Sequence, residues 1–148
     1  MDGDKKNYLT VQSAVDHEKA ENVYMINHNA TLSILRLIRG LEFIKKILEN
    51  IYNNQDNNKK SHELAVNAYD QTIAFRHKWT VRQLVKAGFY LLPKKHDLLQ
   101  IMLRGTDPAN GRKENDALCQ EVLGCLSKIY SIIYKIYEQN DFLELVLA

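Results

Sequence analysis

The longest amphipathic pattern in the chain runs from Thr31 to Tyr52 and predicts one long helix. At about 100° per residue, most of its apolar side chains fall on one wide face. Polar side chains recur at spacings of three and four on the opposite side: Arg39, Glu42, Lys46, Glu49 and Asn53. We expect Asn29 to cap the amino end of this helix.

Arg36 does not join the polar side of this predicted helix. It precedes Phe43 by seven residues and Ile47 by eleven, so the three lie within about 20° of one line along the helix. A guanidinium keeps its charge and avoids dry surroundings unless an anionic group meets it. Two interpretations stay open: a snorkelling or salt-bridged arginine at the edge of a core, or a binder of an anionic group.

The remaining patterns are also helical, and no stretch alternates long enough to predict a strand. We expect a first helix over 7–25, with Leu9, Ala14 and Val15 inward and Glu18 outward. We expect a long helix over 62–92 that Ser61 caps and Pro93 ends. Shorter and longer helices are predicted over 96–104 and 114–139, and the apolar tail should dock on the body. The fold class is therefore all-α, in one domain over residues 1–148.

Composition excludes several classes of protein. A net charge of +2 is too small to favour a nucleic-acid partner, so we expect none. The charged residues within 31–52 make a membrane-spanning helix costly, and the amino end lacks the apolar run of a signal peptide or anchor. Cys119 and Cys125 are typical of buried thiols in a reducing compartment, which favours a cytoplasmic location.

No catalytic motif is complete. HEKAE at His17 and HELAV at His62 begin like a zinc-protease helix, but both lack the second histidine. The loop GTDPANGRK differs from a phosphate loop in its glycine spacing, and Arg112 stands where lysine is needed. We therefore expect no enzyme activity, no metal and no cofactor.

His77 and Trp79 are the remaining candidates for binding. On a continuous helix His77 would share the apolar side of Ile73, Ala74, Val81 and Leu84, either as a hydrogen-bonded core histidine or as a ligand-binding one. Trp79 is the only tryptophan and lies beside Lys78 and Arg82. It is typical either of a core or of a membrane surface, where amphipathic rings are favoured.

Three stretches together resemble the glycolipid transfer protein family: LRLIRGLEFIKKILENI at 35–51, AYDQTIAFRHKW at 68–79 and LLPKKHDLL at 91–99. The resemblance implies a two-layer, all-helical sandwich that holds a sphingolipid, with its chains between the layers. In the family the position of His77 bonds the ceramide amide oxygen, and that of Trp79 contacts the membrane. At the position of Arg36, ceramide-1-phosphate carriers have a phosphate-binding arginine and glycolipid carriers a tryptophan.

The resemblance also assigns supporting roles. It implies that Arg39 supports the headgroup site, that Arg82 joins the membrane contact, and that apolar side chains line the lipid groove: Leu32, Phe43, Ile47, Val81 and Leu84. Leu32 stands where the phosphate branch has a second arginine. The family's acidic and basic headgroup residues lie upstream of the part matching Tyr8. We therefore expect a fold that lacks the first family helices, with uncovered apolar surface that would allow a homodimer.

The predicted function is sphingolipid binding and intermembrane transfer, of ceramide-1-phosphate or a related phosphosphingolipid, by a cytoplasmic protein peripheral at membranes. Two alternatives stay open. One is transfer of a neutral glycosphingolipid, and the other is a helical protein-interaction module that has lost the lipid site.

Overall fold

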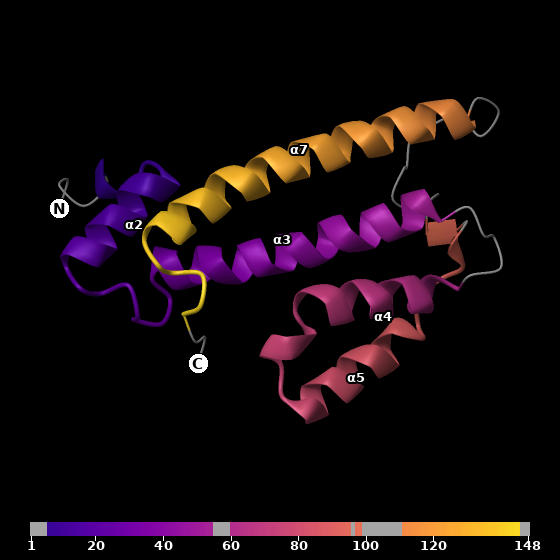
Figure 1. Ribbon diagram of the computed structural model, residues 1–148, viewed down its shortest axis with the longest axis horizontal. Coiled ribbons are helices and arrows are strands. Elements are labelled where there is room, and N and C mark those ends of the chain that lie inside the picture. The colour runs from indigo at the N-terminus through magenta and orange to yellow at the C-terminus, as the bar shows by residue number, and fades with distance from the viewer. Residues whose placement is uncertain (1–5, 55–59, 96, 99–110, 146–148) are drawn as a thin grey trace. The chain divides into compact units, whose positions relative to one another are not determined.

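The computed structural model describes residues 6–54, 60–95, 97–98 and 111–145, and its elements over these residues are helices (Figure 1). They are α2 (Val11–Ala20), α3 (Ala30–Asn53), α4 (Ser61–Thr72), the short 3-10 helix η1 (Ala74–Arg76), α5 (Trp79–Phe89) and α7 (Gly111–Gln139). The predicted helix over 96–104 lies largely outside the described residues. The all-α prediction is confirmed over the part of the chain that is described.

The chain divides into two compact units. The first unit combines residues 1–40 with 128–148, and the second unit is the continuous stretch 41–127. One boundary falls inside α3, after Gly40, and the other inside α7.

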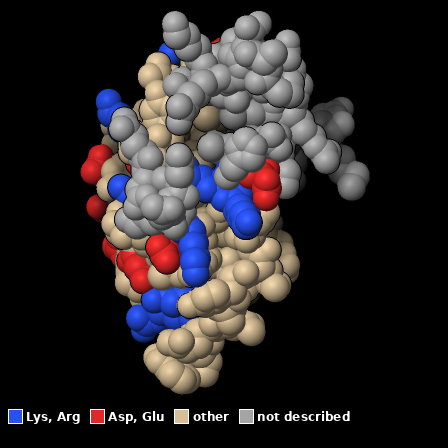
Figure 2. All heavy atoms as spheres, turned by 90° about the vertical axis from the view of Figure 1, so that its right-hand side faces the viewer, with Lys and Arg blue, Asp and Glu red and all other residues tan. Residues whose placement is uncertain are grey.

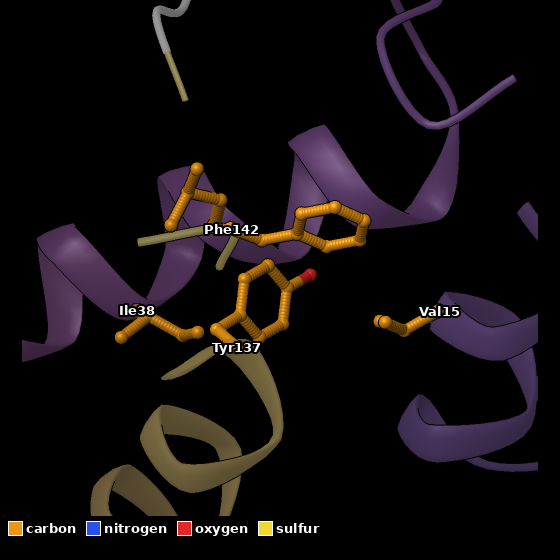
Figure 3. Packing of buried hydrophobic residues seen from close by; sticks show 5 residues of the cluster. Val15, Ile38, Tyr137 and Phe142 are labelled. Carbon is orange, nitrogen blue, oxygen red and sulfur yellow. The ribbon is translucent and has the colours of Figure 1, made fainter. Parts of the chain in front are cut away.

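The core of the first unit brings both ends of the chain together. Its buried cluster consists of Val15 from α2, Leu35 and Ile38 from α3, Tyr137 from α7 and Phe142 from the carboxy-terminal segment (Figure 3). The Phe142 ring stacks on Tyr24 with a centroid distance of 4.6 Å. The predicted docking of the apolar tail is confirmed for its described residues.

A buried glutamate joins α2 to α3, which corrects the prediction that Glu18 faces outward. Glu18 is 0% exposed, and its carboxylate accepts the backbone N–H groups of Ala30 at 2.8 Å and Thr31 at 2.9 Å. The first N–H groups of a helix have no partner within it, and a carboxylate there also meets the positive end of the helix dipole. Asn29 does lie at the predicted position before α3, where its backbone carbonyl accepts the N–H of Ser33 at 3.1 Å, and its side-chain amide donates to the carbonyl of Val23 at 2.7 Å.

The helix α2 is shorter than predicted. Thr10 caps its start through a reciprocal pair of bonds with Ser13, which leaves Leu9 outside the helix and exposed. Asn22 has a left-handed backbone with φ of 56°, so the chain turns soon after Ala20. These local features end the helix well before the expected residue 25.

The predicted long helix over 62–92 is broken in the second unit. α4 ends at Thr72, η1 follows, and His77 and Lys78 are extended before α5 begins at Trp79. Ser61 is the first residue of α4 and not its cap, since Lys60 occupies the cap position without a side-chain bond. α5 ends at Phe89, four residues before Pro93. The break lets α4 and α5 pack against each other as neighbouring helices (Figure 1).

α7 confirms the predicted last helix, and its end at Gln139 matches the prediction. The prediction of buried thiols on this helix is wrong: Cys125 is exposed and Cys119 is half-buried. Cysteine burial therefore gives no support to the predicted reducing compartment.

Candidate functional site

The break between η1 and α5 places His77 against Tyr69. On a straight helix, residues eight apart would lie about 12 Å apart along the axis. Here the Tyr69 Oη and His77 Nδ1 atoms are 2.6 Å apart, because the extended backbone at His77 folds the chain back. His77 therefore has no helical face in common with Val81 and Leu84, which corrects that expectation. His77 is therefore a hydrogen-bonded, half-buried histidine.

Tyr69 is held in an aromatic cluster of the second unit. It is 1% exposed, and its ring meets Phe43 of α3 edge-on at 6.4 Å and Phe89 of α5 at 5.8 Å between centroids. Phe43 and Phe89 stack at 5.8 Å. Three helices thus fix the phenol ring beside His77.

The electrostatic surroundings keep this phenol protonated. Burial raises the pKa of Tyr69 above its ordinary value, Arg82 acts to lower it, and Asp70 acts to raise it. Asp70 also forms an ion pair with Lys86 at 2.8 Å, which joins α4 to α5. At neutral pH Tyr69 therefore keeps its proton and can donate a hydrogen bond.

α5 exposes apolar side chains, and none of its residues is buried. Trp79 at its start is 67% exposed and Leu84 is 75% exposed, with Val81 and the neighbouring Phe75 also exposed. In Figure 2 the lowest part of the molecule, where α5 lies, is covered mainly by uncharged atoms with Lys and Arg atoms beside them. The core interpretation of Trp79 is therefore wrong, and the surface interpretation agrees with its exposure.

In the first unit, Arg36 is exposed on α3, and its Nη2 donates to Asn27 Oδ1 at 3.2 Å. Arg39 donates to the backbone carbonyls of Leu143 at 2.9 Å and Leu145 at 3.0 Å, so it holds the carboxy-terminal segment. Leu32 is 2% exposed and part of the packed interior.

The predicted site residues are thus distributed over both units. Arg36, Arg39 and Leu32 belong to the first unit, whereas the residues from 41 onward belong to the second: Phe43, Ile47, His77, Trp79, Val81, Arg82 and Leu84. Within the second unit the structure brings Phe43 and His77 together through Tyr69. The roles of Arg36 and His77 in one headgroup site, and of the five apolar residues in one groove, stay predictions.

Tyr69 was not predicted from the sequence as a site residue. It appeared only within the Ala-Tyr pair of the resembling motif, and an uninterrupted helix would have placed it two turns from His77. A signal for the break was absent, since residues 73–78 contain neither glycine nor proline.

The described part of the chain also bears on metal binding and on membrane insertion. It contains no group of three or more His, Cys, Asp or Glu side chains placed to hold a metal ion. Among its helices, none is both long enough and apolar enough to cross a membrane.

The described residues form an all-helical fold, and comparison with known proteins identifies the family. The model of the family described as glycolipid transfer protein matches residues 1–104. The chain belongs to this family, which confirms the resemblance of its sequence motifs.

The ceramide-1-phosphate transfer protein of Xenopus tropicalis is 28% identical over 144 residues, 93% of this chain and 64% of that relative. The glycolipid transfer protein of Danio rerio is 24% identical over 144 residues, covering 95% of this chain and 63% of the relative. The chain thus spans a little under two thirds of these relatives. The crystal structure of mouse ceramide-1-phosphate transfer protein in its apo form superimposes with a TM-score of 0.81 at 25% identity, covering 95% of this chain and 68% of that chain. The predicted glycolipid-transfer-protein fold is confirmed.

Proposed function

We propose that this chain binds one sphingolipid and carries it between membranes without a chemical step. The observation that carries the proposal is its membership of the glycolipid transfer protein family. The physical need is clear: each methylene exposed to water costs about 0.8 kcal/mol, so a chain of a dozen methylenes faces a barrier of roughly 10 kcal/mol. Apolar walls remove most of that barrier. We assign this role to the predicted groove residues: Leu32, Phe43, Ile47, Val81 and Leu84.

We further propose that the headgroup is a phosphate, as in ceramide-1-phosphate or a related phosphosphingolipid. Two observations support this. The curated relative in Xenopus tropicalis is named a ceramide-1-phosphate transfer protein, and Arg36 is an exposed guanidinium whose one hydrogen-bond partner among the described residues is Asn27. The guanidinium fork pairs with phosphate through two charge-assisted bonds, each worth about 1.5–3 kcal/mol before desolvation. Arg39 would support this site indirectly, by fixing the carboxy-terminal segment.

Membrane contact completes the proposed cycle. Trp79 and the exposed apolar side chains of α5 would enter the membrane interface while Arg82 meets anionic headgroups. The protein would then act as a cytoplasmic carrier that is peripheral at membranes. The same exposed apolar surface would allow a homodimer, which sedimentation of the lipid-free protein would detect as a concentration-dependent mass.

The test is competition between ceramide-1-phosphate and a glucosylceramide of the same chain length. We expect the parent protein to prefer the phosphate lipid by one to two powers of ten, about 1.4 kcal/mol for each tenfold. Arg36→Trp should reverse or abolish this preference, whereas Arg36→Lys should reduce it by keeping the charge and losing the fork. Lys128→Gln, which removes an exposed cation of α7, is the matched control and should leave the ratio unchanged.

Two outcomes favour the alternatives. A parent protein that prefers the sugar lipid would indicate a neutral glycosphingolipid carrier, in agreement with its likeness to the Danio rerio glycolipid transfer protein. Native mass spectrometry after extraction with lipid vesicles tests the other alternative. A protein that emerges without lipid from every vesicle composition would favour a helical protein-interaction module.

A further inference from the structure

We infer that Tyr69 is a positioning residue that fixes the proton of His77 on Nε2, so that His77 favours amide-linked lipids over ester-linked ones. This inference rests on the proposed function, with His77 in its predicted role of bonding the amide oxygen of the lipid. It assigns part of the lipid specificity to Tyr69, which does not itself need to touch the lipid. Its basis is the short contact between Tyr69 Oη and His77 Nδ1, 2.6 Å.

The phenol ring of Tyr69 is held in place by the described side chains that pack around it. Its ring is 1% exposed and lies between Phe43 and Phe89, and the centroids of the Tyr69 and His77 rings are 5.7 Å apart. A phenol held in this way has little freedom to turn its hydroxyl from the imidazole. The position of its oxygen is therefore set by packing, before any ligand arrives.

The direction of this hydrogen bond follows from the two groups. A phenol O–H is a stronger donor than an imidazole N–H, and an unprotonated imidazole nitrogen is a strong acceptor. Neutral imidazole carries one proton, so the Tyr69 hydroxyl donates to Nδ1 and the ring proton resides on Nε2. The opposite edge of His77 then presents a donor and not an acceptor.

A fixed donor discriminates between carbonyl groups. The oxygen of an amide carbonyl carries more negative charge than that of an ester and accepts a stronger hydrogen bond. Sphingolipids have an amide at the branch of their two chains, whereas phosphatidic acid has esters and the same phosphate headgroup. Tyr69 would thus help to separate two lipids that an arginine alone cannot distinguish.

The experiment compares the parent protein with Tyr69→Phe, which keeps the ring and removes the hydroxyl. Nitrogen-15 NMR of the His77 ring reports the tautomer, and equilibrium binding compares ceramide-1-phosphate with phosphatidic acid of matched chain length. We expect the parent to hold the proton on Nε2 and the variant to show a mixture. The preference for ceramide-1-phosphate should fall roughly fivefold, the value of one hydrogen bond.

Tyr90→Phe is the matched control. Tyr90 also pairs with a histidine, since its ring stacks on His62 with a centroid distance of 4.4 Å, but it is exposed. It should change neither the His77 tautomer nor the lipid preference. His77→Gln offers a second background, because a glutamine amide donates without a choice of tautomer. Adding Tyr69→Phe to His77→Gln should leave the preference within about twofold.

A parent ring protonated on Nδ1, or an unchanged preference in Tyr69→Phe, would overturn the inference while leaving sphingolipid transfer intact. A parent protein that binds neither lipid would overturn the proposed function and, with it, the lipid preference. The NMR signature would then report on its own whether Tyr69 sets the tautomer of His77.

Discussion

The junction of α2, α3 and α7 in the first unit differs sharply from α5 in the second. At the junction, a buried carboxylate and a buried phenol form hydrogen bonds: Glu18 accepts two backbone N–H groups, and Tyr137 donates to the carbonyl of Thr31 at 2.7 Å. On α5, large apolar side chains are exposed and none of its residues is buried.

The difference separates residues that hold the fold from residues that are available for contact. Buried polar groups in satisfied pairs are costly to disturb, because removing one partner leaves the other without water or a bond. Exposed apolar side chains contribute little to the folded state until another surface covers them. Substitutions at the junction should therefore change stability, whereas substitutions on α5 should change binding.

Glu18→Ala should give the largest loss of stability. It leaves the N–H groups of Ala30 and Thr31 without their acceptor, and we expect the free energy of unfolding to fall by about 3 kcal/mol. Urea denaturation measures the loss, and hydrogen exchange at these two amides locates it. Glu21→Ala, at an exposed position just after α2, should change stability by no more than about 0.5 kcal/mol. Unchanged exchange at Ala30 and Thr31 in Glu18→Ala would contradict the capping role.

Tyr137→Phe should cost about 1–2 kcal/mol, because the buried carbonyl of Thr31 loses its donor. Burial, and secondarily the Glu18 carboxylate, raises the pKa of Tyr137 well above its ordinary 10.0. The folded chain therefore keeps a proton that the unfolded chain loses, so stability present below pH 10 is lost as the pH rises above it. The phenylalanine variant should lack this part of the alkaline loss. Parallel alkaline stability curves for the parent and the variant would count against this account.

Trp79→Ala should weaken vesicle binding on the order of tenfold while lowering the free energy of unfolding by no more than about 1 kcal/mol. The reason is that the side chain is 67% exposed. Parent fluorescence should shift to the blue when phospholipid vesicles are added, and co-sedimentation measures the variant. Trp79→Phe should recover part of the binding. If the fluorescence spectrum of the parent protein does not change when vesicles are added, membrane contact at this residue is excluded.

Asp70→Asn should have the smallest effect. It breaks the ion pair between Asp70 of α4 and Lys86 of α5. Their side chains are 44% and 32% exposed, respectively. Solvent screens such a pair, so we expect a loss of no more than about 0.5 kcal/mol that disappears in high salt. A loss above about 1 kcal/mol would show that α5 depends on this pair more than its exposure suggests.

Periodicity predicted the helical class, the central helix and the last helix, because amphipathic patterns of this length have one regular solution. It did not predict the burial of Glu18. Because Glu18 lies between His17 and Lys19, the sequence pattern predicts that it belongs to a solvated face. Its burial depends on its contact with the amino end of α3. That is a tertiary event that local sequence does not encode.

The site was predictable where a motif named a residue and not where it depended on backbone geometry. His77 and Trp79 were identified by their resemblance to a family motif, and the exposure of Trp79 agrees with its predicted role. The Tyr69–His77 bond was not predicted, because nothing in residues 73–78 signals the break that creates it. The missing information is the extended backbone at His77.

The division of the chain into units also bears on the order in which it folds during synthesis. The second unit is a continuous stretch, 41–127, and all its residues are made before residue 128. The contact of Glu18 with Thr31 spans only 13 residues, whereas Tyr137 and Thr31 are 106 apart. The α2–α3 junction can therefore form early, yet its core lacks Tyr137 and Phe142 until the last helix leaves the ribosome. A premature stop before Tyr137 would leave the amino-terminal helices with an incomplete core.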